Sequence, residues 1–369
     1  MSDNKPRGGA PVLAVSQPTE AITTRKRISD KQLDTSLLGK LRYEMQFIRG
    51  RGAFEIGIVF LLLLAGFTVA SLIFPDEFPF LSPANFSGVL TQSIPLMAIL
   101  AIGVGILMIA GEFDLSLGFA ITFNAIVFVR VTELFGPLAG IFAGLASGIL
   151  VGLVNGAIVV FTKIPSFIAT LGMGFFWGGA SIFINGSQAA QLPAELASEG
   201  SWFEFLFAHN FGAFRSQLVW LIIIGLAAYF FLQRHRLGNH IYAVGGNASA
   251  ATAISINPTK VKLMAFGIEG FLVGFAAIIF VARIPSVQPG GSATQDFTLF
   301  AVAAAVVGGA SLLGGRGTVV GMIIVAALIE IIKNGLILGR APGFYLQLFV
   351  GVTIVIAAIF NRYMERKAS

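Results

Sequence analysis

The sequence predicts an all-α fold, a polytopic bundle of about ten transmembrane helices, from three observations. The 369 residues are 56% hydrophobic and only 11% charged, less than half the charge of an average soluble chain. Long apolar segments recur along the chain, and clusters of Pro and Gly separate them. The few polar side chains could not cover an aqueous surface in a chain with 35 Phe residues. These observations exclude a soluble globular protein.

The N-terminal region differs in kind from the rest of the chain. Residues 1–53 contain ten Lys and Arg and no apolar run long enough to enter a bilayer, so we expect a basic, partly disordered cytoplasmic tail. Residues 33–51 fit either a basic amphipathic helix on the membrane surface or a solvated tail. No cleavable signal peptide is expected, because the apolar segments begin only after this region. After this tail we expect a membrane domain over residues 54–361 and a short cytoplasmic tail over residues 362–369.

Ten segments of the membrane domain are candidates for the roughly 20 mostly apolar residues that a span requires. They are 54–74, 88–110, 115–133, 137–161, 164–184, 217–232, 263–282, 297–313, 318–333 and 344–361. An even number of spans with both termini in the cytoplasm places 19 of the 24 Lys and Arg on the cytoplasmic side and five outside. This asymmetry follows the positive-inside rule. Topology therefore explains the net charge of +6 without a nucleic-acid partner.

Several kinds of chemistry are missing from the sequence. It has no G-x-x-x-x-G-K-[ST] phosphate loop, so we expect no ATP hydrolysis in this chain and no enzymatic activity. With no Cys and three His, we expect neither a metal site nor a cofactor. Few acids lie inside predicted spans, and one of them, Glu330, can pair with Lys333 one turn away. The composition favours a gated passage driven from outside; an ion-coupled secondary carrier and a passive channel are the alternatives.

The longest loop on the cytoplasmic side, residues 233–262, has the features of a lever for a partner subunit. Its Ala-rich middle predicts a short helix that begins after Gly245-Gly246-Asn247. The helix is expected to end before Asn257-Pro258, because Pro cannot continue it. An ordinary interfacial loop is the alternative. The residues that we expect to couple this loop to an ATP-hydrolysing partner are Gly245, Gly246, Asn247, Ala250, Ala251, Asn257 and Pro258.

Ordered motifs after residue 85 carry a resemblance to a known family. They are GEFDLSLG (111–118), GLVNGAIV with KIPSFIATLG (152–172), RLGNHIYAVGGN (236–247), GGASLLGGRGTVVG (308–321) and KNG (333–335). In this order they resemble the membrane permeases of bacterial ABC importers for ribose, xylose and related simple sugars. The resemblance implies a homodimeric or paired pore in the inner membrane, an ATP-hydrolysing subunit at the cytoplasmic loops, and a periplasmic sugar-binding protein. It does not identify the sugar.

The motif GEFDLSLG predicts a broken helix. Gly111 permits a tight turn, and Asp114 can cap a helix that begins near Leu115. Inside a membrane, such a break is tolerated only where it is packed in protein or lines an aqueous cavity. A structural cap is one interpretation, and direct sugar contact by Asp114, Glu112 or Ser116 is the other. Relatives usually have Gly and an aliphatic residue where this chain has Glu112 and Phe113.

Glu269 is the third pathway candidate beside Asp114 and Ser116. It lies in the seventh predicted span, where the family usually has a small or amide residue. Its carboxyl group could snorkel to the interface, bond to another span or face a cavity.

A possible internal repeat gives a further indication of the pathway. Gly105, Gly111 and Gly118 match Gly308, Gly314 and Gly321 at a constant offset of 203 residues, although chance coincidence is an alternative in a chain with 44 Gly.

Overall fold

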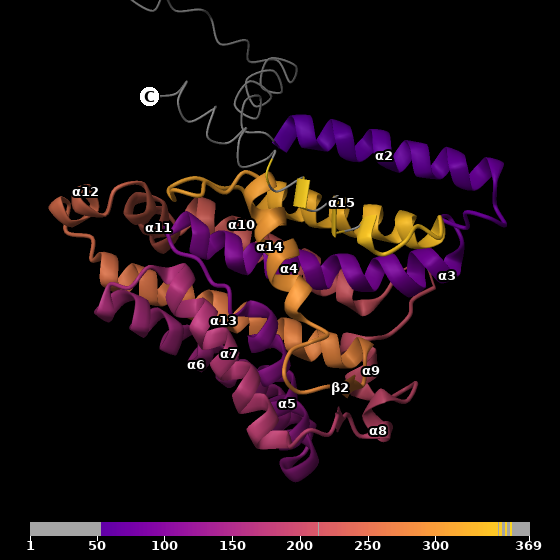
Figure 1. The fold of residues 1–369 in the computed structure, drawn as a ribbon, viewed down its shortest axis with the longest axis horizontal. Coiled ribbons are helices and arrows are strands. Elements are labelled where there is room, and N and C mark those ends of the chain that lie inside the picture. Colours follow the sequence, from indigo (N-terminus) through magenta and orange to yellow (C-terminus); the bar gives the residue numbers. More distant parts are fainter. Residues whose placement is uncertain (1–52, 213, 346, 349–350, 353–354, 356–369) are drawn as a thin grey trace, which may run out of the picture. The chain divides into compact units, whose positions relative to one another are not determined.

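The structure is a computed structural model that describes residues 53–345 except 213, together with 347, 348, 351, 352 and 355. The predicted N-terminal tail and its surface helix, most of the predicted tenth span and the C-terminal tail lie outside the described residues. Within the described part the chain is helical, which confirms the all-α prediction (Figure 1). One small antiparallel ladder joins β1 (Ala190–Gln191) to β2 (Ser286–Val287).

Seven helical segments of the described part are long and apolar enough to cross a membrane. They are the segment Pro83–Ile109, made of α3 (Pro83–Asn85), the π-helical turn η1 (Phe86–Leu90) and α4 (Thr91–Ile109), then α5 (Leu117–Phe135), α6 (Pro137–Thr162), α7 (Ser166–Asn185), α10 (Ser216–Arg234), α13 (Pro258–Arg283) and α15 (Val319–Leu338). Further apolar helices are α2 (Ala53–Ile73) and α14 (Gln295–Val307). The connecting helices are α8 (Ala194–Ala197), α9 (Trp202–Phe207), α11 (Arg236–Gly246) and α12 (Ala248–Ala253).

The helices follow the predicted spans except near the eighth and ninth. The eighth prediction, 297–313, is wrong in its second half, because α14 ends at Val307 and a glycine-rich turn follows. The ninth prediction stops too early, since α15 continues to Leu338. Seven spanning helices indicate a multi-pass membrane protein. The number ten and the cytoplasmic side of both termini stay predictions.

α4 is the buried centre of the described helices. Its hydrophobic side chains from Leu96 to Ala110 each expose 1% or less of their surface. It contacts α10, α13, α14 and α15, and Figure 1 shows it beside the last three. A helix that is apolar on every side is buried among other helices or faces lipid, and the low exposure of α4 shows that other helices surround it. α4 therefore supplies the core against which both halves of the chain pack.

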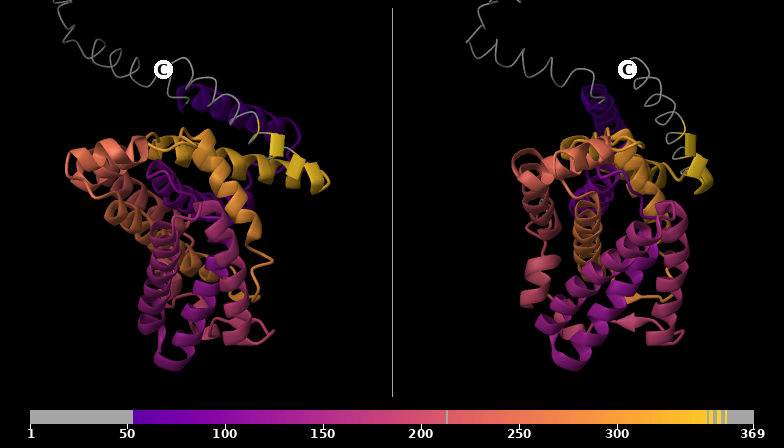
Figure 2. Two further views of the ribbon diagram at one scale, coloured as in Figure 1. Left: turned by 60° about the vertical axis from the view of Figure 1, so that its left-hand side comes forward. Right: turned by 90° about the vertical axis from the view of Figure 1, so that its left-hand side faces the viewer.

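Large apolar side chains cover the outward faces of α6, α7 and α10. Phe142 is 71% exposed, Phe183 is 91% exposed and Ile222 is 55% exposed. α5, α6 and α7 contact one another, and the views of Figure 2 show these purple-to-magenta helices running together. Such faces match the hydrocarbon interior of a bilayer, where apolar side chains need no cover.

A seam of glycines lets α6 and α13 touch through their backbones. A methyl group on Gly148 would lie 2.3 Å from the carbonyl oxygen of Gly270, and one on Gly152 would lie 2.1 Å from that of Phe266. Gly274 makes a similarly close approach from the side of α13. Small residues at this spacing allow membrane helices to associate by close packing. The glycine-rich run in 137–161 is therefore a packing seam between α6 and α13.

α13 is about as long as a bilayer is thick, and it separates the 233–262 loop from the segment 186–215. Its 26 residues extend about 39 Å at 1.5 Å per residue. α12 precedes its first residue, while β2 follows its last and pairs with β1. The 233–262 loop and the segment 186–215 after α7 therefore lie toward opposite ends of α13 (Figure 1).

The seam predicts a sharp difference between two glycine substitutions. Gly148→Ala forces a methyl group against the backbone of α13 and should lower the free energy of unfolding by about 1–3 kcal/mol. Gly179→Ala on α7 is the matched control, because no atom lies within 4 Å of its added methyl group. Thermal unfolding of the purified variants in detergent measures the difference. Equal melting temperatures would contradict the seam.

Candidate functional site

The first candidate region interrupts the helix path between α4 and α5, and we call residues 110–116 the first break. Gly111 adopts a φ of 85°, a left-handed conformation that favours glycine. Two hydroxyl groups of α7 accept hydrogen bonds from backbone N–H groups of the first break. The hydroxyl of Ser166 accepts from Phe113 at 3.0 Å, and that of Thr170 accepts from Leu115 at 2.9 Å. The donors that leave the helix ladder therefore find protein partners, as a low-dielectric setting requires.

Asp114 stabilises the first break differently from the prediction. Its Oδ1 accepts a hydrogen bond from the N–H of Ser116 at 2.6 Å. The helix starts two residues after Leu115, because the N–H of Leu115 bonds to α7 and α5 begins at Leu117. Asp114 thus closes a turn before the helix instead of capping its first turn.

A buried amide completes the polar network around Asp114. Asn155 of α6 donates through Nδ2 to Oδ2 of Asp114 at 3.0 Å and to Oγ of Ser116 at 2.7 Å. Its Oδ1 accepts from Nε1 of Trp177 at 3.1 Å. Asp114 is 2% exposed and Ser116 is fully buried, so neither side chain faces an open passage in this structure. Asn155 was not predicted as a site residue, although it lies in the motif GLVNGAIV.

A second interruption, residues 308–318, lies between α14 and α15, and we call it the second break. Gly314 adopts a φ of 85°, the same value as Gly111, its partner in the proposed repeat. Thr318 caps α15 by accepting a hydrogen bond from the N–H of Gly321 at 3.1 Å. The correspondence is incomplete, since Gly105 lies inside α4 whereas Gly308 follows the end of α14.

Threonines of α14 and its N-terminal cap join the two helix pairs. Oγ1 of Thr298 accepts from the N–H of Gly118 at 2.9 Å, and Oγ1 of Thr294 donates to the carbonyl oxygen of Gly118 at 2.6 Å. A methyl group on Gly118 would lie 2.5 Å from the Thr294 carbonyl oxygen. The start of α5 is therefore fixed against the start of α14.

The 233–262 loop contains the predicted short helix and another that the prediction missed. Asn247 caps α12 by accepting from the N–H of Ala250 at 2.9 Å, and Asn257 caps α13, which begins at Pro258, by accepting from Lys260 at 3.1 Å. Gly245 and Gly246, which were expected to lead into the short helix, are also the last residues of the preceding helix α11. The signal for α11 was the helical spacing of its buried residues, Gly238, Ile241 and Val244.

α12 presents a mixed surface. Ala250 is exposed and Ile254, just after the helix, is 69% exposed, whereas Ala251 is buried at 2%. The two alanines that the sequence grouped together therefore point in different directions. An exposed large apolar side chain on a short polar segment is a feature of contact surfaces.

Glu269 points into the protein interior. It is 1% exposed, so snorkelling to the membrane surface does not describe it, and its Oε1 has no hydrogen-bond partner among the described residues. The predicted pairing of Glu330 is present, with Nζ of Lys333 at 3.7 Å. In the part of the chain that the structure describes, no three His, Asp or Glu residues gather where a metal ion could bind.

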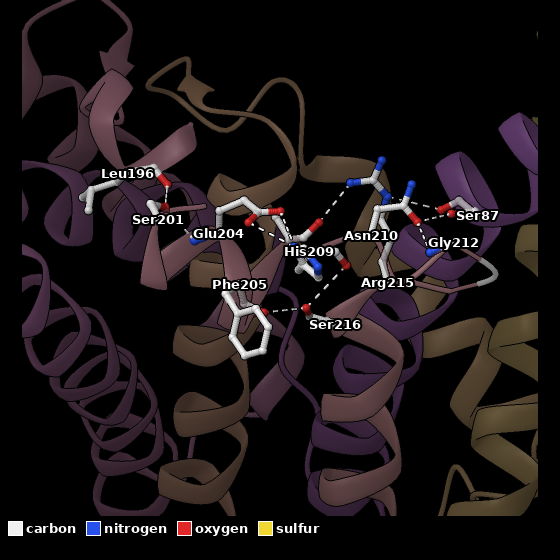
Figure 3. Close-up of polar contacts among 11 residues, drawn as sticks. Ser87, Leu196, Ser201, Glu204, Phe205, His209, Asn210, Gly212, Arg215 and Ser216 are labelled. Atoms are coloured by element: carbon white, nitrogen blue, oxygen red, sulfur yellow. Dashed lines mark hydrogen bonds and ion pairs between the residues drawn. The ribbon is translucent and has the colours of Figure 1, made fainter. Parts of the chain in front are cut away.

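In the segment 186–215, side chains of α9 and of the turn after it form a hydrogen-bonded platform that was not predicted from the sequence (Figure 3). Ser201 caps α9 by accepting from the N–H of Glu204 at 3.0 Å, and the Glu204 carboxylate lies 3.1 Å from Nδ1 of His209. Asn210 accepts from the hydroxyl of Ser87 at 2.7 Å, which connects the platform to η1. The signal was the pair Ser201 and Glu204, a capping-box spacing at the start of an aromatic run.

Comparison with protein families gives one match. A family model described as "Branched-chain amino acid transport system / permease component" matches residues 85–358. The two breaks, the 233–262 loop and the segment 186–215 all fall inside this range.

Three similar proteins are sugar permeases by name. The chain is 33% identical to the ribose import permease protein RbsC of Escherichia coli (strain K12), over 82% of this chain and 92% of that protein. It is 30% identical to the L-arabinose ABC transporter permease protein AraH of Azospirillum brasilense, over 84% and 88%. It is 27% identical to the fructose import permease protein FrcC of Rhizobium meliloti, over 75% and 78%. No solved structure matches the chain significantly.

The network around Asp114 predicts that two residues can be exchanged. Asp114→Leu removes one of the two acceptors of Asn155 Nδ2 and the acceptor of the N–H of Ser116, which should lower the free energy of unfolding by about 1–3 kcal/mol. The double variant Asp114→Asn with Asn155→Asp keeps the charge and can remake the bonds to Ser116 and Trp177. We expect its melting temperature to return toward that of the unmodified protein. A double variant as unstable as Asp114→Leu would contradict the network.

Proposed function

Since the chain belongs to the family of transport-system permease components, we propose that it is the permease subunit of an ATP-binding-cassette importer for a monosaccharide or related small polyhydroxy substrate. The observation that carries this proposal is the near full-length similarity to import permeases for ribose, arabinose and fructose. The family description also includes amino-acid transport, so branched-chain amino acids are the control substrates. The proposed location is the bacterial inner membrane.

The 233–262 loop is the proposed docking site of the ATP-hydrolysing subunit. The chain has no phosphate loop of its own, and importers of this family are driven by a partner. Ala250 and Ile254 offer an exposed small-and-apolar surface, while Asn247 and Asn257 fix the ends of α12 and the start of α13 by capping. Ala251 holds α12 against the protein instead of contacting the partner.

The segment 186–215 is the proposed contact for a periplasmic sugar-binding protein. It lies toward the end of α13 away from the 233–262 loop, and its hydrogen bonds to η1 and α10 keep it rigid. A rigid surface can receive a preformed partner without the cost of ordering a loop. A second permease subunit, a copy or a paralogue, would complete the pore.

The three pathway candidates take different proposed roles. Asp114 and Ser116 position the first break, because both carboxylate oxygens of Asp114 are already bonded. Glu269 is the better candidate for contact with water or sugar when the passage opens. Its Oε1 lacks a partner in the described structure, and a buried acid in a span usually serves transport.

Reconstitution in liposomes tests this function. The chain alone should hydrolyse no ATP and accumulate no sugar. With its ATPase and a sugar-binding protein, ATP inside the vesicles should drive accumulation of at least one sugar from a panel of pentoses, hexoses and polyols, measured as trapped radiolabel.

Two results would contradict the proposal. Proton-driven accumulation by the chain alone would indicate an ion-coupled carrier, and equilibration without accumulation in the complete complex would indicate a passive channel. Uptake of leucine with no uptake of any sugar would overturn the proposed substrate class.

A further inference from the structure

The two breaks and the 233–262 loop meet at one point, where only backbone lies between them. The carbonyl oxygen of Ile109, the last residue of α4, accepts a hydrogen bond from the N–H of Gly315 at 2.9 Å. This bond joins the first break to the second. Gly245, at the end of α11, packs against both partners of this bond.

The fit around Gly245 leaves no room for any side chain. A methyl group there would lie 1.8 Å from the Ile109 carbonyl oxygen and 2.7 Å from the nitrogen of Gly315. A methyl group on Gly314 would lie 2.6 Å from the carbonyl oxygen of Gly245 and 2.9 Å from Cα of Gly111. Contacts this close transmit displacement directly, because no flexible side chain separates the backbones.

Two side chains fasten the 233–262 loop to the same breaks. The hydroxyl of Tyr242 donates to the carbonyl oxygen of Gly317 in the second break at 2.9 Å. Nζ of Lys262, near the start of α13, lies 2.5 Å from Oε1 of Glu112 in the first break. α11 therefore holds the second break by a polar contact in addition to the glycine packing, and the start of α13 holds the first break.

We propose that Gly245 is the positioning residue through which the 233–262 loop moves both helix breaks together. A shift of α11 would displace Ile109 and Gly315 at once, because both contact the same glycine. The breaks would then change the helix directions of α4 with α5 and of α14 with α15 in a single step. This inference rests on the proposed role of the chain as a permease driven by a separate ATPase.

Two glycines provide a matched test. Gly179→Ala on α7 should be tolerated, because no atom lies within 4 Å of its added methyl group, whereas Gly245→Ala cannot fit without moving α11. In the reconstituted complex we measure ATPase co-purification, ATP hydrolysis and sugar uptake. We expect Gly245→Ala to retain the ATPase and its hydrolysis but to lower uptake per ATP at least tenfold, and Gly179→Ala to match the unmodified protein.

A cross-link keeps the proposal testable if Gly245→Ala fails to fold. The chain has no Cys, so Glu112→Cys with Lys262→Cys gives a single pair for a bifunctional thiol reagent with a cleavable bridge. Bridging the start of α13 to the first break should stop uptake while the ATPase stays bound, and cleavage should restore uptake. Uptake unchanged by the bridge, or by Gly245→Ala, would overturn the inference.

Separate readouts distinguish failure of this inference from failure of the proposed function. An unmodified complex that retains no ATPase would refute the proposed function. An unmodified complex that transports normally, with coupled transport also in Gly245→Ala, would refute only the role of Gly245. Ala250→Glu, on the exposed face of α12, is the control that should lose the ATPase while the junction stays intact.

Discussion

The need to satisfy every backbone polar group away from water governs this molecule. A helix that breaks inside a bilayer releases N–H and C=O groups that lipid cannot bond. In the first break these groups are bonded by hydroxyls of α7, while Asp114 and Asn155 hold the turn. In the second break the backbone bonds to itself and to Ile109. The breaks can therefore exist only where α6, α7 and α11 pack tightly around them.

Glycine makes this packing possible at two levels. Along α6 and α13, glycines bring two spans into backbone contact and fix the bundle. At the junction of the breaks, glycines also supply the left-handed turns at Gly111, Gly314 and Gly315. The glycines of α6 and α13 hold these two helices together. The glycines of the breaks lie where the helices meet the 233–262 loop. The tightly packed pair of α6 and α13 lies next to two helix breaks whose backbone groups are hydrogen-bonded. This arrangement suits a movement of the helices between two discrete states.

The sequence predicted the fold class, most spans and the position of α12, because hydropathy and Pro or Asn boundaries are local signals. It did not predict that α14 ends at Val307. A count of apolar residues does not show that the glycines after Val307 form a turn instead of continuing the helix. The roles of Asn155 and Trp177 depend on contacts between α6, α7 and the first break, which no local pattern contains. Ala250 and Ala251 were indistinguishable by composition, and only packing showed which one is buried. The motifs located the two breaks and the 233–262 loop, but only tertiary contacts showed which of their side chains are buried and which are hydrogen-bonded.

Hydrogen exchange of the complete complex tests most directly whether the breaks and the 233–262 loop move as one unit. The informative amides are those of Phe113, Leu115 and Gly315, which donate to Ser166, Thr170 and Ile109. When a non-hydrolysable ATP analogue occupies the ATPase, their exchange rates should change together with those of the 233–262 loop. Exchange that changes in the loop while these three amides keep their nucleotide-free rates would contradict the account.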